Sequence, residues 1–277
     1  MMHAPGDDAA AEAREAADSA GVVVRALDTA TPMAPVSRML SAVWNLGPNE
    51  THVPAELMTA MAHTGNYLSA AYRDGEPVGG CIGFFAEPLG RRLHSHIAGV
   101  VPRLAGRGIG RALKLHQRAW CLARGIDEVS WTFDPLVARN AYFDIARLGA
   151  RPAEYLTDFY GSLDDVFNAG QPTDRLLLVW DLHAASATAA AARPAPADAP
   201  AVLRISDGEP DVRLECGEGA DVVTAAIPPD IDAVRAADPA RAGRWRLALR
   251  HVLTSLLESG RHVQGFDKSG FYLVGEG

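Results

Sequence analysis

The spacing of apolar and polar residues divides the first two thirds of the chain into strands and helices. Alternating or continuous apolar runs predict strands over 21–27, over 66–87 with a turn at Asp74–Gly75, over 91–102 and over 127–133, with two more near 153–161 and 174–183. Apolar residues at helical spacing predict helices over 33–45, 54–63, 109–124 and 137–148. The order β-α-α-β-β-β-α-β-α-β-β predicts an α/β fold, a mixed sheet with helices on both faces.

Two low-complexity segments set the expected domain boundaries. Residues 1–20 are rich in alanine and acidic side chains, which predicts a disordered tail or a marginal helix. Residues 184–201 mix alanine with repeated proline, which is typical of a linker. A body of 21–183 is therefore expected, followed by a smaller unit of 202–277.

The pattern of the C-terminal segment predicts a small ββαββ unit. The runs VRLECGEG and DVVTAAIP are expected to pair as strands, and the closing RHVQGFDKSGFYLVGEG is expected to form a hairpin. Between them, Asp238 is a candidate N-cap and Pro239 a candidate first residue of a helix that extends to about Glu258.

Composition and charge narrow the class of protein. The chain of 277 residues carries a formal net charge of −8, which argues against a nucleic-acid partner. Its three cysteines, Cys81, Cys121 and Cys216, form no close pair, so neither a disulfide scaffold nor a metal site is expected. No basic leader and no long apolar run is seen, so we expect a cytoplasmic protein without membrane contact.

The glycine-rich stretch VVPRLAGRGIG, residues 100–110, carries the clearest chemical signal. It does not match the phosphate-binding pattern GxxxxGK. It also does not match the dinucleotide-binding pattern GxGxxG, because Arg111 or Leu113 occupies the position of the third glycine. Asp127 and Glu128 do lie where that pattern has a ribose-binding carboxylate. The pattern Arg-x-x-Gly-x-Gly does fit, through Arg103, Gly106 and Gly108, with Gly110 in addition.

The chemistry of this stretch favours an anion. The N–H groups at a helix start near Ile109 would face a diphosphate, glycines would let the backbone approach it, and Arg107 and Arg111 would add charge. A glycine-rich turn without a ligand is the alternative.

At these residues the sequence resembles the GNAT superfamily of acyl-CoA-dependent N-acyltransferases. GVVPRLAGRGIGRALK is similar to the motif in which that family cradles the pyrophosphate of coenzyme A, and the resemblance covers about 21–183. LHSHIAGVVPRLAGRGIGRALKLHQRAW, WTFDPLVARNAYFDIARLGA and DFYG further resemble a subgroup of large predicted bacterial members. GFDKSGFYLV resembles the closing strands of the family, so residues 202–277 are a candidate degenerate half-domain.

The resemblance implies a GNAT-like fold, with acetyl-CoA or another acyl-CoA as co-substrate and no metal. It also implies that backbone N–H groups at Val100 and Val101 polarise the thioester. The base is expected on the same strand, where His94 and His96 lie two residues apart and so on one face. Ordinary strand histidines are the alternative, and Glu87 and Asp134 are reserve candidates for the base.

The tyrosine that usually serves as the general acid in the family pattern is absent from its expected position. Counting back from Gly149 puts Ile145 at the usual tyrosine and Ala138 at the usual asparagine. Asn140 and Tyr142 are present but displaced, so Asn140 is a candidate coenzyme A contact and Tyr142 a candidate acid. The competing interpretation is that Tyr142 and Phe143 are aromatic residues of the hydrophobic core.

The acceptor is expected near WNLGPNETHVP, where Trp44, Asn49 and His52 are candidate pocket residues; an ordinary surface loop remains equally compatible. The leading hypothesis is N-acetyl transfer to a small-molecule amine or amino acid. A longer donor such as succinyl-CoA, a non-catalytic acyl-CoA-binding protein and a nucleotide-dependent enzyme stay open, as does a homodimer.

Overall fold

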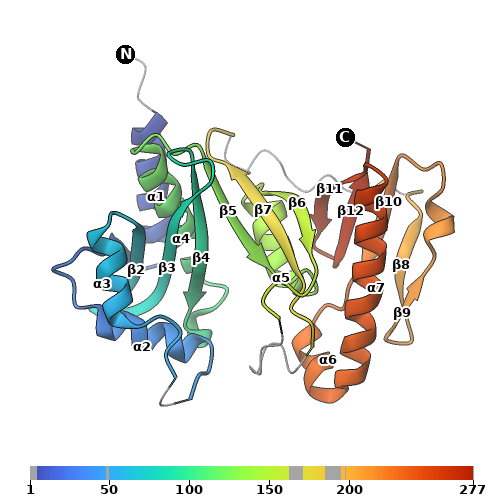
Figure 1. Cartoon of the computed structure of the whole chain (residues 1–277), viewed down its shortest axis with the longest axis horizontal. Helices are drawn as coiled ribbons and strands as arrows, with labels where there is room; N and C mark the ends of the chain where they lie inside the picture. Colours follow the sequence, from blue (N-terminus) through green and yellow to red (C-terminus); the bar gives the residue numbers. More distant parts are fainter. Residues whose placement is uncertain (1–4, 48–49, 162–170, 185–194, 197, 277) are drawn as a thin grey trace. The chain divides into compact units, whose positions relative to one another are not determined.

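The computed structural model describes residues 5–47, 50–161, 171–184, 195–196 and 198–276. The chain divides into two compact units (Figure 1). One consists of Met1–Trp131 with Asp181–His183, and the other of Thr132–Trp180 with Ala184–Gly277. The division falls within strands β5 and β7 and not at the predicted linker, most of which (185–194 and 197) lies outside the described residues.

The first unit is built on a mixed sheet. Its strands run in the order β1 (Val23–Ala26), β2 (Tyr67–Arg73), β3 (Glu76–Ala86), β4 (Arg92–Val100) and β5 (Glu128–Phe133). The pairs β1–β2, β2–β3 and β3–β4 are antiparallel, and β5 is parallel to β4. The predicted turn at Asp74–Gly75 joins β2 and β3, with both residues at positive φ.

Helices cover both faces of this sheet (Figure 1). A Cβ on Gly79 would lie 3.2 Å from a Leu113 methyl carbon of α4 (Ile109–Leu122), and one on Gly80 would lie 3.3 Å from Leu40 of α2 (Met33–Val43). Because successive strand residues point to opposite faces, α2 and α4 lie on opposite sides of the sheet. Helix α3 (Ala55–His63) packs beside α2.

Of the two alternatives predicted for the N-terminal segment, a disordered tail or a marginal helix, the structure shows a helix over Pro5–Ser19. Residues Pro5–Ser19 form α1, which packs along α4 and buries a stripe of small side chains: Ala9, Ala13, Ala16 and Ala17. An alanine-rich segment shows little amphipathic contrast on its own, so its buried face becomes apparent only beside its partner helix.

The second unit begins with the end of β5 and contains two groups of elements. The first group is α5 (Ala138–Ala141), a π-helical turn η2 (Tyr142–Arg147), and the antiparallel pair β6 (Arg151–Leu156) and β7 (Arg175–Asp181). The predicted helix over 137–148 is thus a short α-helix continued by a wider π turn.

The second group is a five-stranded sheet with two helices. The sheet order is β11 (His262–Asp267), β12 (Phe271–Gly275), β10 (Val222–Ala226), β8 (Ala201–Ser206) and β9 (Glu209–Val212). Helices α6 (Ile231–Ala237) and α7 (Pro239–Glu258) follow β10, and Asp238 caps α7 by accepting from the Arg241 N–H, as predicted.

One predicted strand of this group is wrong. Most of VRLECGEG lies outside the strands, with a 3-10 turn over Leu214–Gly217, and β8 supplies the extra strand parallel to β10. A Cβ on Gly217 would come within 2.7 Å of Val202, so this segment packs tightly against β8. Because β8 directly follows the alanine- and proline-rich run, its pattern was hidden by the linker. Within the described residues, no helix is long and apolar enough to cross a membrane.

Candidate functional site

The glycine loop has the backbone geometry of an anion-binding helix start. After β4, a single 3-10 turn (Pro102–Leu104) leads to Gly106 and Gly108, whose φ angles are +76° and +84°. Helix α4 begins at Ile109 with Gly108 as its N-cap, and no side chain among the described residues caps it. The first helical bond runs from the Ala112 N–H to the Gly108 carbonyl, so the preceding N–H groups of α4 have no acceptor within the helix.

The space above this loop is open. Apart from the neighbours in sequence, no atom of the described residues lies within 4 Å of a Cβ built on Gly106, and for one on Gly108 the nearest is Ala20, at 3.7 Å. The loop residues 105–108 are exposed. Bare backbone, positive φ and unsatisfied donors together fit the diphosphate of a nucleotide-bearing cofactor.

The arginines around the loop differ in their partners. Arg103 and Arg107 are exposed, and the structure shows no ion pair for either among the residues it describes. Arg111 instead donates to Glu12 of α1 at 3.1 Å, and Arg118 donates to the same carboxylate at 3.1 Å. The sequence assigned Arg111 to the cofactor but gave no sign of Glu12, since that contact spans almost 100 residues.

One of the two predicted thioester-binding N–H groups is already used. The Val101 N–H donates to the Val78 carbonyl at 2.9 Å. Since successive N–H groups of an antiparallel strand point to opposite sides, the Val100 N–H points away from β3, towards the other edge of β4. The parallel ladder with β5 covers only Arg92–His94, so beyond it this edge has no ladder partner in the described part of the chain.

The two candidate bases lie together on β4. The ring centroids of His94 and His96 are 6.3 Å apart, and both rings contact Phe84, at 5.3 and 5.6 Å. His96 is the extra residue of a β-bulge, because Ile97 pairs with Ile82 and Ser95 with Gly83. His94 Nδ1 lies 3.2 Å from the Ser130 hydroxyl.

The surroundings of His94 and His96 lower the pKa values of both side chains. Burial lowers the pKa of His94 to about 4, with the neighbouring charges of His96 and Lys114 as further causes. Burial also lowers the pKa of His96. Both imidazoles are therefore neutral at pH 7 and able to accept a proton.

Asp134, a reserve candidate for the base, is committed elsewhere. Arg246 donates to both of its oxygens at 2.6 Å, and Arg235 donates to one at 2.5 Å. Burial would raise the pKa of Asp134, but these guanidinium groups hold it well below its ordinary value. A carboxylate so tightly paired cannot act as a base near neutral pH. The other reserve, Glu87, is exposed in the β3–β4 connection.

Asn140 and Tyr142 lie in the second unit. Asn140 is exposed at the end of α5, and Tyr142 is half-buried at the start of the π turn. Residues Tyr142–Arg147 form a π turn, which is wider than an α-helical turn, so the angle between the Tyr142 and Ile145 side chains about the helix axis differs from that in a regular α-helix.

Lys114 was missed by the sequence analysis. It is buried in α4, where its ammonium donates to Ser95 and Gln117 and lies 3.8 Å from the centroid of the Trp131 ring. Ser95 and Trp131 directly follow the last ladder pair of β4 and β5. A lysine at a core position of an amphipathic helix was the signal in the sequence.

The acceptor candidates are partly brought together. Trp44 and His52 stack with centroids 4.4 Å apart, and the Trp44 ring covers Gly99, where a Cβ would come within 2.7 Å. Asn49 lies outside the described residues. The stacked pair thus sits over β4 just before the glycine loop.

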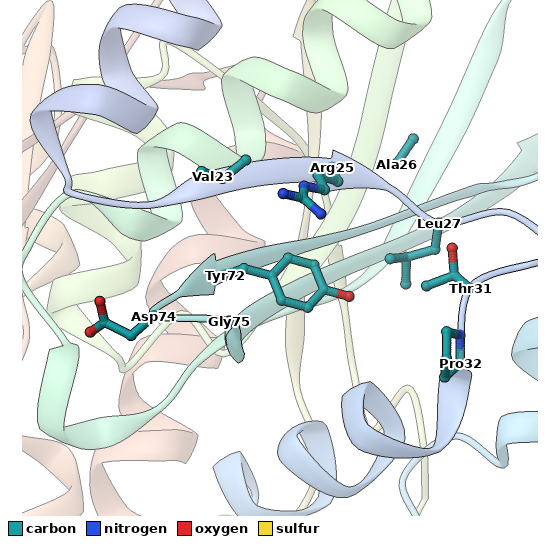
Figure 2. A pocket seen from close by; sticks show the side chains of 9 residues that line it. All are labelled: Val23, Arg25, Ala26, Leu27, Thr31, Pro32, Tyr72, Asp74 and Gly75. Carbon is teal, nitrogen blue, oxygen red and sulfur yellow. The ribbon is translucent and has the colours of Figure 1, made fainter.

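A separate cavity of about 340 Å³ lies at the free edge of the sheet (Figure 2). Val23 and Arg25 of β1, Tyr72 of β2 and the Asp74–Gly75 turn line it, and Thr31 and Pro32 close it beside α2. The Arg25 guanidinium carbon lies 5.8 Å from the Tyr72 ring centroid. Neither the glycine loop nor the histidine pair contributes to this cavity.

Comparison with known proteins identifies the domain. The model of a family described as "Acetyltransferase (GNAT) domain" matches residues 8–143. No protein of curated function matches the chain significantly.

Solved structures show distant similarity. A GNAT-family protein from Desulfovibrio desulfuricans is 16% identical, with a TM-score of 0.47, over 58% of this chain and 99% of its own. A GNAT family acetyltransferase from Elizabethkingia anophelis with acetyl-CoA bound is 15% identical, with a TM-score of 0.43, over 58% and 98%. IAA acetyltransferase from Bacillus cereus is 16% identical, with a TM-score of 0.42, over 58% and 99%.

The residues that the family model matches include the sheet of the first unit, the glycine loop and α4. The chain therefore carries a GNAT acetyltransferase domain over residues 8–143.

Proposed function

We propose that this protein is an acyl-CoA-dependent N-acyltransferase that moves an acetyl group to the amine of a small molecule or amino acid. The observation that carries the proposal is the uncapped start of α4 behind two glycines at positive φ. Such a start favours a diphosphate, and the GNAT family match makes coenzyme A the diphosphate expected there.

The donor would be held along α4 and β4. The N–H groups of Ile109, Gly110 and Arg111 face the diphosphate, and the exposed Arg103 and Arg107 supply charge-assisted hydrogen bonds. The Val100 N–H, directed to the unpaired edge of β4, is the donor available to polarise a carbonyl oxygen. Asn140, which is exposed in α5, is a further proposed coenzyme A contact.

The acyl-CoA thioester supplies an activated acyl group, and the protein must remove a proton from the ammonium form of the acceptor. His96, the more exposed of the neutral pair, is the proposed base, with His94 beside it. Trp44 and His52 are proposed to contact the acceptor. Tyr142 is the proposed acid, which would donate its proton to the departing thiolate of coenzyme A as the amide forms.

A second function class is favoured by one observation. Ile145 is buried where the family pattern has a tyrosine, which suits a protein that binds acyl-CoA without transferring the acyl group. The donor length is also open, since the glycine loop contacts the diphosphate and not the acyl chain; succinyl-CoA therefore belongs in the same test.

A thiol-release assay decides between these functions. Acetyl-CoA and succinyl-CoA are each offered with a panel of amines and amino acids, and free coenzyme A is measured. We expect release that depends on one class of amine. Saturable binding of coenzyme A without turnover on any acceptor would favour the binding protein instead.

A further inference from the structure

Lys114 of α4 is a buried charge that contacts two strands of the first unit. The residue is 3% exposed, and a lysine is rarely buried so completely unless its ammonium has partners. The ammonium donates to the Ser95 hydroxyl of β4 at 3.1 Å and lies 3.8 Å from the centroid of the Trp131 ring of β5. It also donates to the Gln117 side chain of α4 at 2.9 Å. Lys114 therefore connects α4 with both strands.

These contacts lie where β4 and β5 stop pairing. The parallel ladder between the two strands ends with His94 opposite Ser130. Ser95 and Trp131 are the next residues along each strand, so the bridge through Lys114 lies one position beyond the last ladder pair. Because successive strand residues point to opposite faces, Ser95 and Trp131 face α4 while His94 and Ser130 face the other side of the sheet. The bridge is therefore directly behind the face that carries the histidine pair.

The bulge of β4 begins directly after Ser95. His96 is its extra residue and so has no ladder partner on β3. Strand β3 lies very close at this point, since a Cβ on Gly83, opposite Ser95, would be 2.9 Å from the His94 carbonyl oxygen. The direction of the His96 side chain therefore depends on how the neighbouring residues of the bulge are held.

Ser95 is held from two sides through its hydroxyl group. The Lys114 ammonium can only donate, so the Ser95 oxygen accepts this bond, and its own hydrogen can be donated to the Cys81 sulfur of β3, 3.6 Å away. Ser95 and Cys81 are both buried, and burial raises the pKa of the Cys81 thiol, which stays neutral. Ser95 is thus fixed between α4 and β3 immediately before the bulge.

The charge of Lys114 also acts on the histidine pair. Burial is the main cause of the low pKa of His94, and the charges of His96 and Lys114 lower this pKa further. Two positions earlier on β4 and β5 lie Arg92 and Glu128, which are bonded to each other at 2.6 and 3.0 Å. The ring that β3 places against His94 is uncharged. Removal of the Lys114 charge would therefore raise the pKa of His94.

We propose that Lys114 is a positioning residue: by holding Ser95 and Trp131 it fixes the bulge of β4, and so keeps His94 and His96 in the arrangement that proton removal needs. The inference rests on the proposed function, in which His96 is the base. All of its contacts lie within the first unit.

The experiment compares two cations that each lie over a tryptophan ring, in the full-length protein. Lys114→Met removes the buried ammonium and keeps a side chain of similar length. Arg124→Met is the matched control, because Arg124 is exposed and its guanidinium carbon lies 4.0 Å from the Trp120 ring centroid. Each variant is assayed with acetyl-CoA and the amine selected by thiol release, and its histidines are titrated by NMR.

We expect Lys114→Met to lower kcat about tenfold and to change KM less than about twofold, because the base is displaced while the substrate contacts remain. The pKa of His94 should rise from about 4 to about 5, since a nearby positive charge is lost. Arg124→Met should change neither kcat nor the histidine titrations.

A double-mutant cycle with Ser95→Ala separates positioning from charge. Ser95→Ala should lower kcat about tenfold but leave the pKa of His94 near 4, because the ammonium stays in place. The double variant should lose no more than about twentyfold, since both changes remove the same hydrogen bond; independent effects would multiply to about a hundredfold and would overturn the inference. If Lys114→Met does not fold, Ser95→Ala alone decides, and an unchanged kcat overturns the inference.

The remaining outcomes distinguish this inference from the proposed function. A wild type that transfers to no amine overturns the proposed function, and the kinetic part of this inference with it, while the titration still shows whether Lys114 acts on His94. An active wild type, with Lys114→Met equal to it in kcat and in the His94 titration, overturns this inference alone. A lower melting temperature with an unchanged kcat would likewise overturn it, by showing a structural role only.

Discussion

The glycine loop and the Asp134 cluster use arginine in opposite ways. At the loop, Arg103 and Arg107 are exposed beside helix N–H groups that have no helical acceptor. In the cluster, Arg235 and Arg246 are almost fully buried and bonded to carboxylates. A charge kept in water beside unsatisfied donors is available to a ligand, whereas a charge buried against its counterion is committed to the fold. The same residue type therefore indicates binding in one unit and support in the other.

The largest expected effect comes from placing a negative charge in the loop. Gly108→Glu would put a carboxylate at the helix start and a non-glycine residue at a φ of +84°, so we expect coenzyme A affinity to fall by about a thousandfold or more. Gly125→Glu is the matched control, at the other end of α4 with a φ of +72°. Calorimetry on both variants checks this; equal losses would mean that strain, and not charge, is responsible.

The claim that buried arginines stabilise the fold is tested by measuring the free energy of unfolding. Arg250→Met leaves Asp174, which is 0% exposed, without its bidentate partner, and should lower the free energy of unfolding by about 3 kcal/mol. Arg244→Met, on the exposed side of α7, should lower it by no more than about 0.5 kcal/mol. Urea denaturation measures both. Similar values for the two would refute the claim that burial sets the cost.

The histidine pair lies between these extremes: His94 is half-buried, His96 is exposed, and both rings are neutral at pH 7. Burial lowers the pKa of His94 to about 4 and also lowers that of His96, so the proposed base becomes protonated only at a pH below about 6.5, the ordinary histidine pKa. The lower limb of the kcat/KM profile should therefore lie below that pH. His94→Ala with His96→Ala should remove this limb and cost about a hundredfold in rate at pH 7. His63→Ala, which changes an exposed histidine of α3, is the control. If the decline of kcat/KM at low pH is unchanged in the double variant, another group is the base.

The smallest expected effect is the difference in coenzyme A affinity between variants of two arginines: Arg107, which has no ion pair among the described residues, and Arg111, which is paired with Glu12. Arg107→Ala should weaken coenzyme A binding about tenfold, the size of one charge-assisted hydrogen bond. Arg111→Ala should weaken it only about twofold, because Glu12 already holds that guanidinium. Titrations at two salt concentrations measure both. A larger loss at Arg111 would show that ligand binding displaces Glu12.

The sequence predicts what depends on neighbours along the chain. The turn at Asp74–Gly75, the cap of α7 at Asp238 and the helix start behind Gly108 are local features, and the structure confirms each. They follow from backbone and capping preferences that the residues carry with them.

The sequence pattern does not predict which residues far apart in the chain contact each other. Asp134 is read as a candidate base because its sequence neighbours end a strand, and only the fold brings Arg246, over 100 residues away, against it. The same holds for Glu12 with Arg111. The π turn at Tyr142–Arg147 was also missed, since helical spacing alone does not distinguish it from an α-helix.

The central claim is that N–H groups at the start of α4 bind a diphosphate that carries pantetheine. Calorimetric titration of the full-length protein with coenzyme A and with pantetheine, which lacks the diphosphate, tests it most directly. We predict saturable heat for coenzyme A with a Kd on the order of 10 µM, and binding of pantetheine at least about tenfold weaker. Equal affinity for the two compounds, or no saturable heat with coenzyme A, would contradict the account.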